Sequence, residues 1–65
     1  MRYLVKLGRQ YLERVETLSN GKKQVITTQY KYDAADAGTM RNALKLAEKL
    51  DGQAVMFDPL NGDIF

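Results

Sequence analysis

Apolar side chains in the first half of the chain follow the patterns of β-strands. Residues 3–7 carry them at every second position and end at a glycine, which predicts a first strand. Residues 24–32 are rich in β-branched and aromatic side chains, which predicts a strand that needs a partner. The spacing in residues 10–18 fits a helix as well as a strand. Because Asn20-Gly21, just beyond them, is the strongest short hairpin signal, we predict a strand that pairs with residues 24–32.

The turns between these strands decide which side chains share a face of the sheet, because a shift of one residue moves a strand's side chains to the other face. We take residues 20–21 as the two-residue turn of the second hairpin. The first hairpin has two candidate turns, residues 8–9 and residues 8–10. Only the longer turn gathers one apolar set on a single face: Tyr3, Val5, Leu7, Tyr11, Val15, Ile26 and Tyr30. We therefore predict the longer turn, which leaves Glu13 as the misfit on this face.

A helical pattern opens the second half of the chain. Its apolar stripe follows helical spacing and consists of Met40, Ala43, Leu44, Ala47 and Leu50. Thr39 is the predicted N-cap, with Asp33 and Asp36 as earlier alternatives. The pair Asp51-Gly52 ends the helix, because glycine readily takes the left-handed conformation that follows a helical C-terminus. The stripe predicts that the helix packs on one face of the sheet.

The last strand completes an α+β fold in the order β-β-β-α-β. Residues 53–57 are mostly apolar and predict a buried strand, and the sequence leaves open whether residues 64–65 fold back along it. A right-handed crossover makes this strand parallel to the first and third, with the spatial order 3-2-1-4. We therefore predict a single domain, residues 1–65, in which one helix packs on one face of a small, mostly antiparallel sheet of three to four strands.

The composition removes most of the usual catalytic and metal-binding chemistry. The chain has neither Cys nor His, so it offers no thiolate, no disulfide and no imidazole. Among the remaining candidates, the Ser19 hydroxyl adjoins a turn where it bonds the backbone, and Glu13 is explained by an edge position or a basic neighbour. Oxygen ligands cluster at Asp58, Asn61 and Asp63, but the spacing of a calcium loop is missing. We expect no enzymatic activity, no metal and no cofactor.

The uncovered face of the predicted sheet is the expected working surface. Three aliphatic side chains lie on it: Leu4, Leu12 and Val25. A set of basic residues surrounds them: Arg2, Lys6, Arg14, Lys23 and Lys31. An apolar centre with a charged rim is typical of protein interfaces, which predicts a protein partner or a second copy of the chain. Binding of nucleic acid through the same basic residues is the alternative, and it is weaker because most tyrosines, which stack on bases, are assigned to the opposite face.

Charge is unevenly distributed along the chain. Residues 1–32 carry seven basic and two acidic side chains, a formal charge of +5, whereas residues 33–65 carry three basic and six acidic ones, a charge of −3. Such asymmetry often has no role in binding, although it also suits an acidic partner. The longest unbroken apolar run, residues 54–57, is far too short to cross a membrane, and residues 1–6 lack the core of a signal peptide. We expect a cytoplasmic protein.

Four short stretches of the chain carry a resemblance to a known group of proteins: the opening Met-Arg-Tyr-Leu-Val-Lys, the helical stretch at residues 43–50, the Asp51-Gly52 break and the strand that begins with Gln-Ala-Val. Together they resemble small uncharacterised phage and prophage accessory proteins of Gram-positive bacteria. The similarity covers most of the chain, and residues 19–28 contain nothing diagnostic of such proteins. The resemblance implies a compact accessory protein with no established activity. Because phage accessory proteins commonly act by occupying a host protein, it favours an interaction module. It transfers no functional residue.

Overall fold

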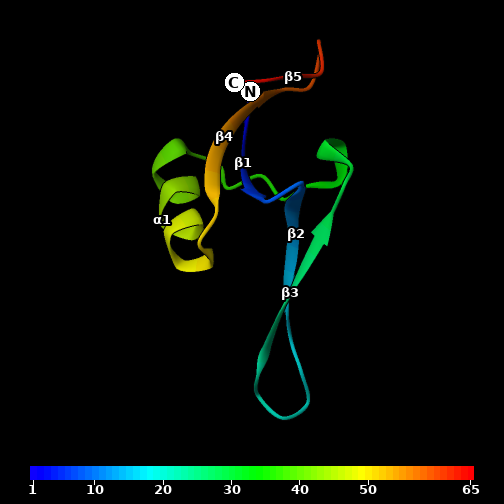
Figure 1. Ribbon diagram of the computed structural model, residues 1–65, viewed down its shortest axis with the longest axis vertical. Coiled ribbons are helices and arrows are strands. Elements are labelled where there is room, and N and C mark those ends of the chain that lie inside the picture. Colours follow the sequence, from blue (N-terminus) through cyan, green and yellow to red (C-terminus); the bar gives the residue numbers. More distant parts are fainter.

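The secondary structure follows the predicted order with one more short strand at the end. In the computed structural model, which describes residues 1–65, the strands are β1 (Arg2–Leu7), β2 (Gln10–Thr17), β3 (Lys23–Thr28), β4 (Gln53–Asp58) and β5 (Asp63–Ile64). The short 3-10 helix η1 (Lys31–Asp33) and the helix α1 (Met40–Leu50) lie between β3 and β4. All five strands form one antiparallel sheet in the order β3-β2-β1-β4-β5 (Figure 1). The α+β class is confirmed, and β5 extends the predicted order 3-2-1-4, so the predicted count of three to four strands is wrong.

The fourth strand runs antiparallel to the first, which corrects the predicted parallel crossover. In this pair Tyr3 lies opposite Met56 and Val5 lies opposite Ala54. The chain between β3 and α1 has already returned to the beginning of β1, where the Ala37 amide donates to the Tyr3 carbonyl at 2.8 Å. The helix then runs down beside β1, and β4 has to return in the opposite direction (Figure 1).

Both faces of the β1–β4 pair are buried, so the apolar side chains do not share one face as predicted. On one face Val5 packs with Leu12 beneath α1. The Leu4 side chain points away from the face of Val5 and packs with Val55 and Phe57 on the other face. That second face is covered by η1 and the segment after it. A strand buried on both sides carries adjacent apolar residues instead of alternating ones, which is why the single-face criterion fails.

The first two strands are joined by the shorter of the two candidate turns. Leu7 lies opposite Gln10, so the turn consists of residues 8–9, and the predicted three-residue turn is wrong. The strands pair only next to this turn and then diverge. The segment before α1 fills the gap between them, where the Ala35 amide donates to the Leu12 carbonyl at 2.9 Å. The sheet is therefore curled, with β1, β4 and β5 on one side of a corner and β2 and β3 on the other (Figure 1).

The two ends of α1 differ in how well they were predicted. The Thr39 hydroxyl accepts from the Asn42 amide at 3.1 Å, which confirms Thr39 as the N-cap. At the other end the left-handed residue is Asp51, with a φ of 57°, so the role assigned to Gly52 is wrong. Gly52 is required for a different reason, because a Cβ atom there would lie 2.5 Å from Cδ2 of Leu7. The close approach of the helix end to β1 leaves no room for a side chain.

The helix buries a narrower stripe than predicted. Ala43 and Ala47 are buried against the sheet, and Leu46 and Leu50 pack at the margin of the core. Leu44, which we predicted in the core, is 56% exposed. The small alanine side chains let the helix lie close to the sheet, and this turns Leu44 towards solvent.

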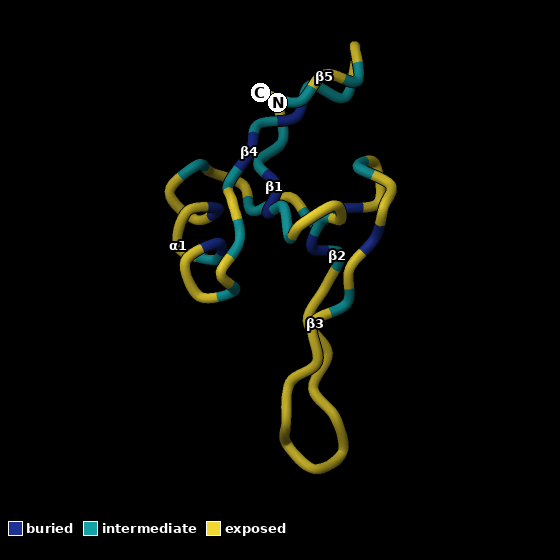
Figure 2. The backbone as a smooth tube through the Cα atoms, viewed as in Figure 1, coloured by how far each residue is buried: buried dark blue, intermediate teal, exposed yellow.

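The β2–β3 hairpin projects from the rest of the molecule. The molecule measures 41 Å along its longest axis and 21 Å and 20 Å along the other two, and the hairpin occupies one end of the long axis (Figure 1). Every residue from Arg14 to Val25 is exposed (Figure 2). We call residues 14–25 the hairpin arm and the remainder of the fold the body.

Candidate functional site

The hairpin arm begins where the β2–β3 ladder shifts its register. The partners of Leu12 and Arg14 are adjacent residues of β3, so Glu13 is the extra residue of a β-bulge. The Arg14 guanidinium holds the carboxylates on either side: it forms an ion pair with Glu13, and its Nε donates to Oε1 of Glu16 at 2.7 Å. A bulge bends its strand and increases the local twist. Glu13, which did not fit the apolar face of the predicted register, is thus the residue at which the hairpin arm leaves the body.

The tip of the arm is a three-residue turn, residues 19–21, where a two-residue turn was predicted. The Leu18 amide donates to the Lys22 carbonyl at 2.7 Å, and the Gly21 amide donates to the Leu18 carbonyl at 2.9 Å. Gly21 has a φ of +82°, the left-handed position that closes a three-residue hairpin turn. The pairing of the two strands in the arm is therefore shifted by one residue from the predicted register, and Val15 lies opposite Val25 instead of Ile26.

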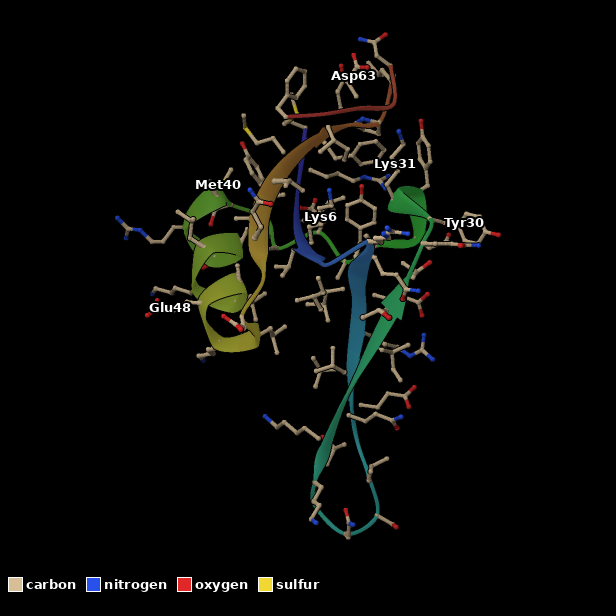
Figure 3. The ribbon with its side chains drawn as sticks, viewed as in Figure 1. Lys6, Tyr30, Lys31, Met40, Glu48 and Asp63 are labelled. Carbon is tan, nitrogen blue, oxygen red and sulfur yellow. The ribbon has the colours of Figure 1, made fainter.

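An exposed pair of valines occupies the middle of the arm. Val15 lies directly opposite Val25, so the two side chains share one face of the hairpin. Val15, predicted in the core, is 45% exposed and Val25 is 40% exposed. Side chains stand out on both sides of the arm with no other element beside them (Figure 3). The fold therefore leaves apolar side chains bare on an element that has neighbours on neither face.

Only Val25, of the three aliphatic residues predicted on the open face, lies at the surface. Leu4 is 0% exposed and Leu12 is 4% exposed, and the two lie in different clusters of the core. Their assignment to a partner-binding surface is therefore wrong. The adjacent apolar residues Leu4 and Val5 are the sequence signal that both faces of β1 are covered. Val15 is the residue that sequence reasoning missed, because no sequence signal showed that β2 continues beyond its contact with β1 into an uncovered arm.

Two of the five basic residues predicted to bind phosphates are engaged within the fold. Arg14 is held between its two carboxylate partners on the arm. The Lys31 ammonium donates to the Gly62 carbonyl, and its Nζ lies 5.6 Å from the centre of the Phe57 ring. Because these groups already engage Arg14 and Lys31, both side chains are less available to a phosphate.

The other three basic residues do not form one patch. Arg2 donates to the Tyr32 carbonyl at 3.4 Å on the body. Lys6 also lies on the body (Figure 3), whereas Lys23 lies on the arm, and neither takes part in an ion pair. Tyr30 is exposed beside η1, although it was predicted beneath the helix. The basic residues are thus divided between two regions, unlike the continuous rim that the sequence predicted.

Two carboxyl groups have a lowered pKa, and both act within the fold. The amides of Tyr3 and Gly38 donate to the Asp36 carboxylate at 3.0 Å and 2.9 Å and hold its pKa below the usual value. The Leu60 amide donates to the Asp58 carboxylate at 3.0 Å and lowers the pKa of that group in the same way. Asp36 joins the segment before α1 to β1, and Asp58 fixes the turn before β5.

The remaining surface offers no enclosed feature that competes with the arm. It has no pocket, and no three acidic side chains lie close enough together to hold a metal ion. The structure contains no helix that is long and apolar enough to cross a membrane. The hairpin arm is therefore the candidate site. No protein family, curated protein or solved structure matches this chain.

Proposed function

We propose that this protein is a non-enzymatic accessory module that binds another protein through its hairpin arm. The observation that carries the proposal is the pair Val15 and Val25, which face each other across the arm and are nearly half exposed. The resemblance to phage accessory proteins, which act by occupying a host protein, agrees with such a role.

The two valines gain free energy when a partner buries them. Full burial of a valine side chain contributes about 1.5–3 kcal/mol relative to leaving it in water. In the free protein a large part of this contribution is unused, because nothing in the chain covers the pair. Thr17 and Lys23 lie two residues from the valines along their strands and on the same face of the hairpin, where they supply a polar border. An apolar centre with a polar border is the usual arrangement of a protein-binding surface.

The experiment uses peptides selected from a random display library on the immobilised protein. We expect the selected peptides to lose at least tenfold in affinity for the double variant Val15→Thr with Val25→Thr, which keeps the β-branched shape but adds hydroxyl groups. The matched control is Leu44→Thr, which changes an exposed aliphatic residue of α1 and should leave the affinity unchanged. Peptides that bind the double variant as tightly as the unaltered protein would contradict the proposal.

A second candidate function is weak binding of nucleic acid by the body. Tyr30 and Tyr32 are 61% and 53% exposed, and Arg2 lies close to them, because it donates to the Tyr32 carbonyl. Exposed tyrosines stack on bases, and basic side chains neutralise phosphates. Mixed-sequence oligonucleotides should then bind more weakly as salt is raised, and Tyr30→Ala should weaken binding further. Absence of binding at low salt rules this function out.

A further inference from the structure

The outer edge of β3 is the longest unpaired strand edge of the sheet. β3 ends the sheet on one side with six residues, and the opposite end is β5, which has only two. The edge of β2 that β1 leaves free is shorter, because it starts at the bulge at Glu13 and ends at Thr17. No helix or loop of the chain hydrogen-bonds to the outer side of β3. An uncovered strand edge is a template for another strand.

The hydrogen bonds at the tip of the arm show which backbone groups of β3 point outwards. The Leu18 amide donates to the Lys22 carbonyl, so Lys22 directs its polar groups towards β2. Residues that bond across an antiparallel ladder alternate with residues that do not. It follows that Gln24 and Ile26 also face β2. Lys23, Val25 and Thr27 therefore present their N–H and C=O groups to the free edge.

We infer that this edge pairs with the β3 edge of a second copy of the chain, antiparallel, around a two-fold axis at Val25. The inference rests on the proposed function of the arm and names its partner. In this register Val25 lies opposite Val25 of the partner subunit, and Lys23 lies opposite Thr27 of the partner subunit. Every outward N–H and C=O group of these three residues in both copies then has a hydrogen-bond partner.

The side chains favour this register as well. Val15 and Val25 lie on one face of each hairpin, so the two copies bring their valine pairs together in one apolar row across four strands. No charged side chain meets a like charge, because Lys23 faces a threonine. A register shifted towards the tip places Lys23 opposite Lys23 of the partner subunit, and one shifted the other way leaves Lys23 outside the pairing. The two-fold axis at Val25 is the one arrangement that uses the whole edge.

The geometry also predicts how strong the association is. Antiparallel pairing along this edge places the two bodies at opposite ends of the joined sheet, so the contact is confined to the arms and to Thr27 just beyond each arm. A contact of one short strand with a single apolar row is small, and such contacts are transient. The dimer should therefore appear only at high protein concentration.

The experiment is sedimentation equilibrium of the whole protein over a wide concentration range. We expect a reversible monomer–dimer equilibrium that Val25→Lys weakens at least tenfold, because it puts two like charges opposite each other at the two-fold axis. The control Leu44→Lys makes the same change at an exposed aliphatic residue of α1 and should alter the dissociation constant less than twofold. Circular dichroism of both variants verifies that each remains folded.

Each other outcome contradicts the proposed dimer. The outcomes differ in whether they also contradict the proposed function. A protein that stays monomeric at every concentration but binds peptides through the valine pair contradicts the dimer and retains the proposed function. A dimer that Leu44→Lys weakens as much as Val25→Lys does is formed by another surface. A monomer that also selects no arm-binding peptide contradicts both proposals.

Discussion

The β1–β4 pair and the hairpin arm both carry apolar side chains, but only the β1–β4 pair buries them. In the β1–β4 pair both faces are covered, so that Leu4 and Phe57 are 0% exposed. In the arm neither face is covered, and Val15 and Val25 stay close to half exposed. Apolar side chains thus occur in both regions, and only those of the body are buried by the chain's own fold (Figure 2).

The strand β2 passes through both regions and shows where the change from buried to exposed side chains occurs. The first part of β2 carries Leu12 in the core, and the part beyond the bulge at Glu13 carries Val15 on the arm. The change from buried to exposed therefore follows from the bulge and the end of β1, and not from a change in composition. Apolar residues that the fold does not bury are free to serve association, which is the basis of the proposed function.

The largest effect is expected from a substitution in the body. Phe57→Ala removes a fully buried ring that packs edge-on against Tyr32, with ring centres 4.9 Å apart. Such truncations cost about 3–5 kcal/mol, and small domains have a free energy of unfolding of only about 5–15 kcal/mol. Urea denaturation should show a protein close to unfolding. The matched truncation in the arm, Val25→Ala, should cost less than about 0.5 kcal/mol, and equal losses in the two variants would contradict the distinction between the regions.

The contact between the end of α1 and β1 should be nearly as sensitive. Gly52→Ala places a Cβ atom 2.5 Å from Cδ2 of Leu7 and 2.7 Å from the Lys6 carbonyl oxygen. Overpacking of this kind costs about 1–3 kcal/mol, measured by thermal or urea unfolding. In a Leu7→Ala background the same change should cost less, because the nearest atom is gone. An unchanged stability in Gly52→Ala would mean that the helix end moves away freely.

The link between β1 and the segment before α1 should give a smaller, pH-dependent loss. Asp36→Ala removes the acceptor of two backbone hydrogen bonds and should cost about 1 kcal/mol. Because the folded-state pKa of Asp36 is lowered, its charge stabilises the fold above the usual pKa of 3.8, and this contribution is lost as the pH falls below it. The difference in stability between the natural protein and Asp36→Asn should therefore shrink on acidification. A difference that does not vary with pH would exclude this role of the charge.

The smallest effect on stability is expected from the arm itself. The double variant Val15→Thr with Val25→Thr keeps two β-branched side chains in an exposed part of the hairpin. Its free energy of unfolding, measured at a concentration where the protein is monomeric, should change by less than about 0.5 kcal/mol per residue. A larger loss would show that the two valines support the monomer's fold.

Sequence patterns predicted the elements well because each rests on local chemistry. The strand at residues 10–18 and the cap at Thr39 both follow from short-range signals, whereas the return of the chain along β4 was left open. The register was wrong because an Asn-Gly pair suits turns of two and of three residues, and nothing local distinguishes them. That difference of one residue placed Val15 opposite Val25 instead of Ile26, whereas the exposure of Val15 follows from the projection of the arm.

The candidate site was only partly predictable, for a reason of long-range packing. Val25 was predicted at the surface, although on the assumption of one uncovered face. Leu4 was misplaced because the cover over the second face comes from η1 and the segment after it, which have no apolar periodicity of their own. Leu12 was misplaced because the shorter turn at residues 8–9 puts it on the same face as Val5, beneath α1. The projection of the arm depends on where β1 and β2 diverge, and no residue type marks that point.

Amide hydrogen exchange along β3, measured by NMR at low and at high protein concentration, tests the central claim most directly. Gln24 and Ile26 face β2, and their amides should be protected to a similar degree at both concentrations. Val25 and Thr27 face the free edge, and their amides should exchange rapidly in the dilute protein and become protected in the concentrated one. Rapid exchange of Val25 and Thr27 at every concentration would contradict the account of the arm as a self-pairing surface.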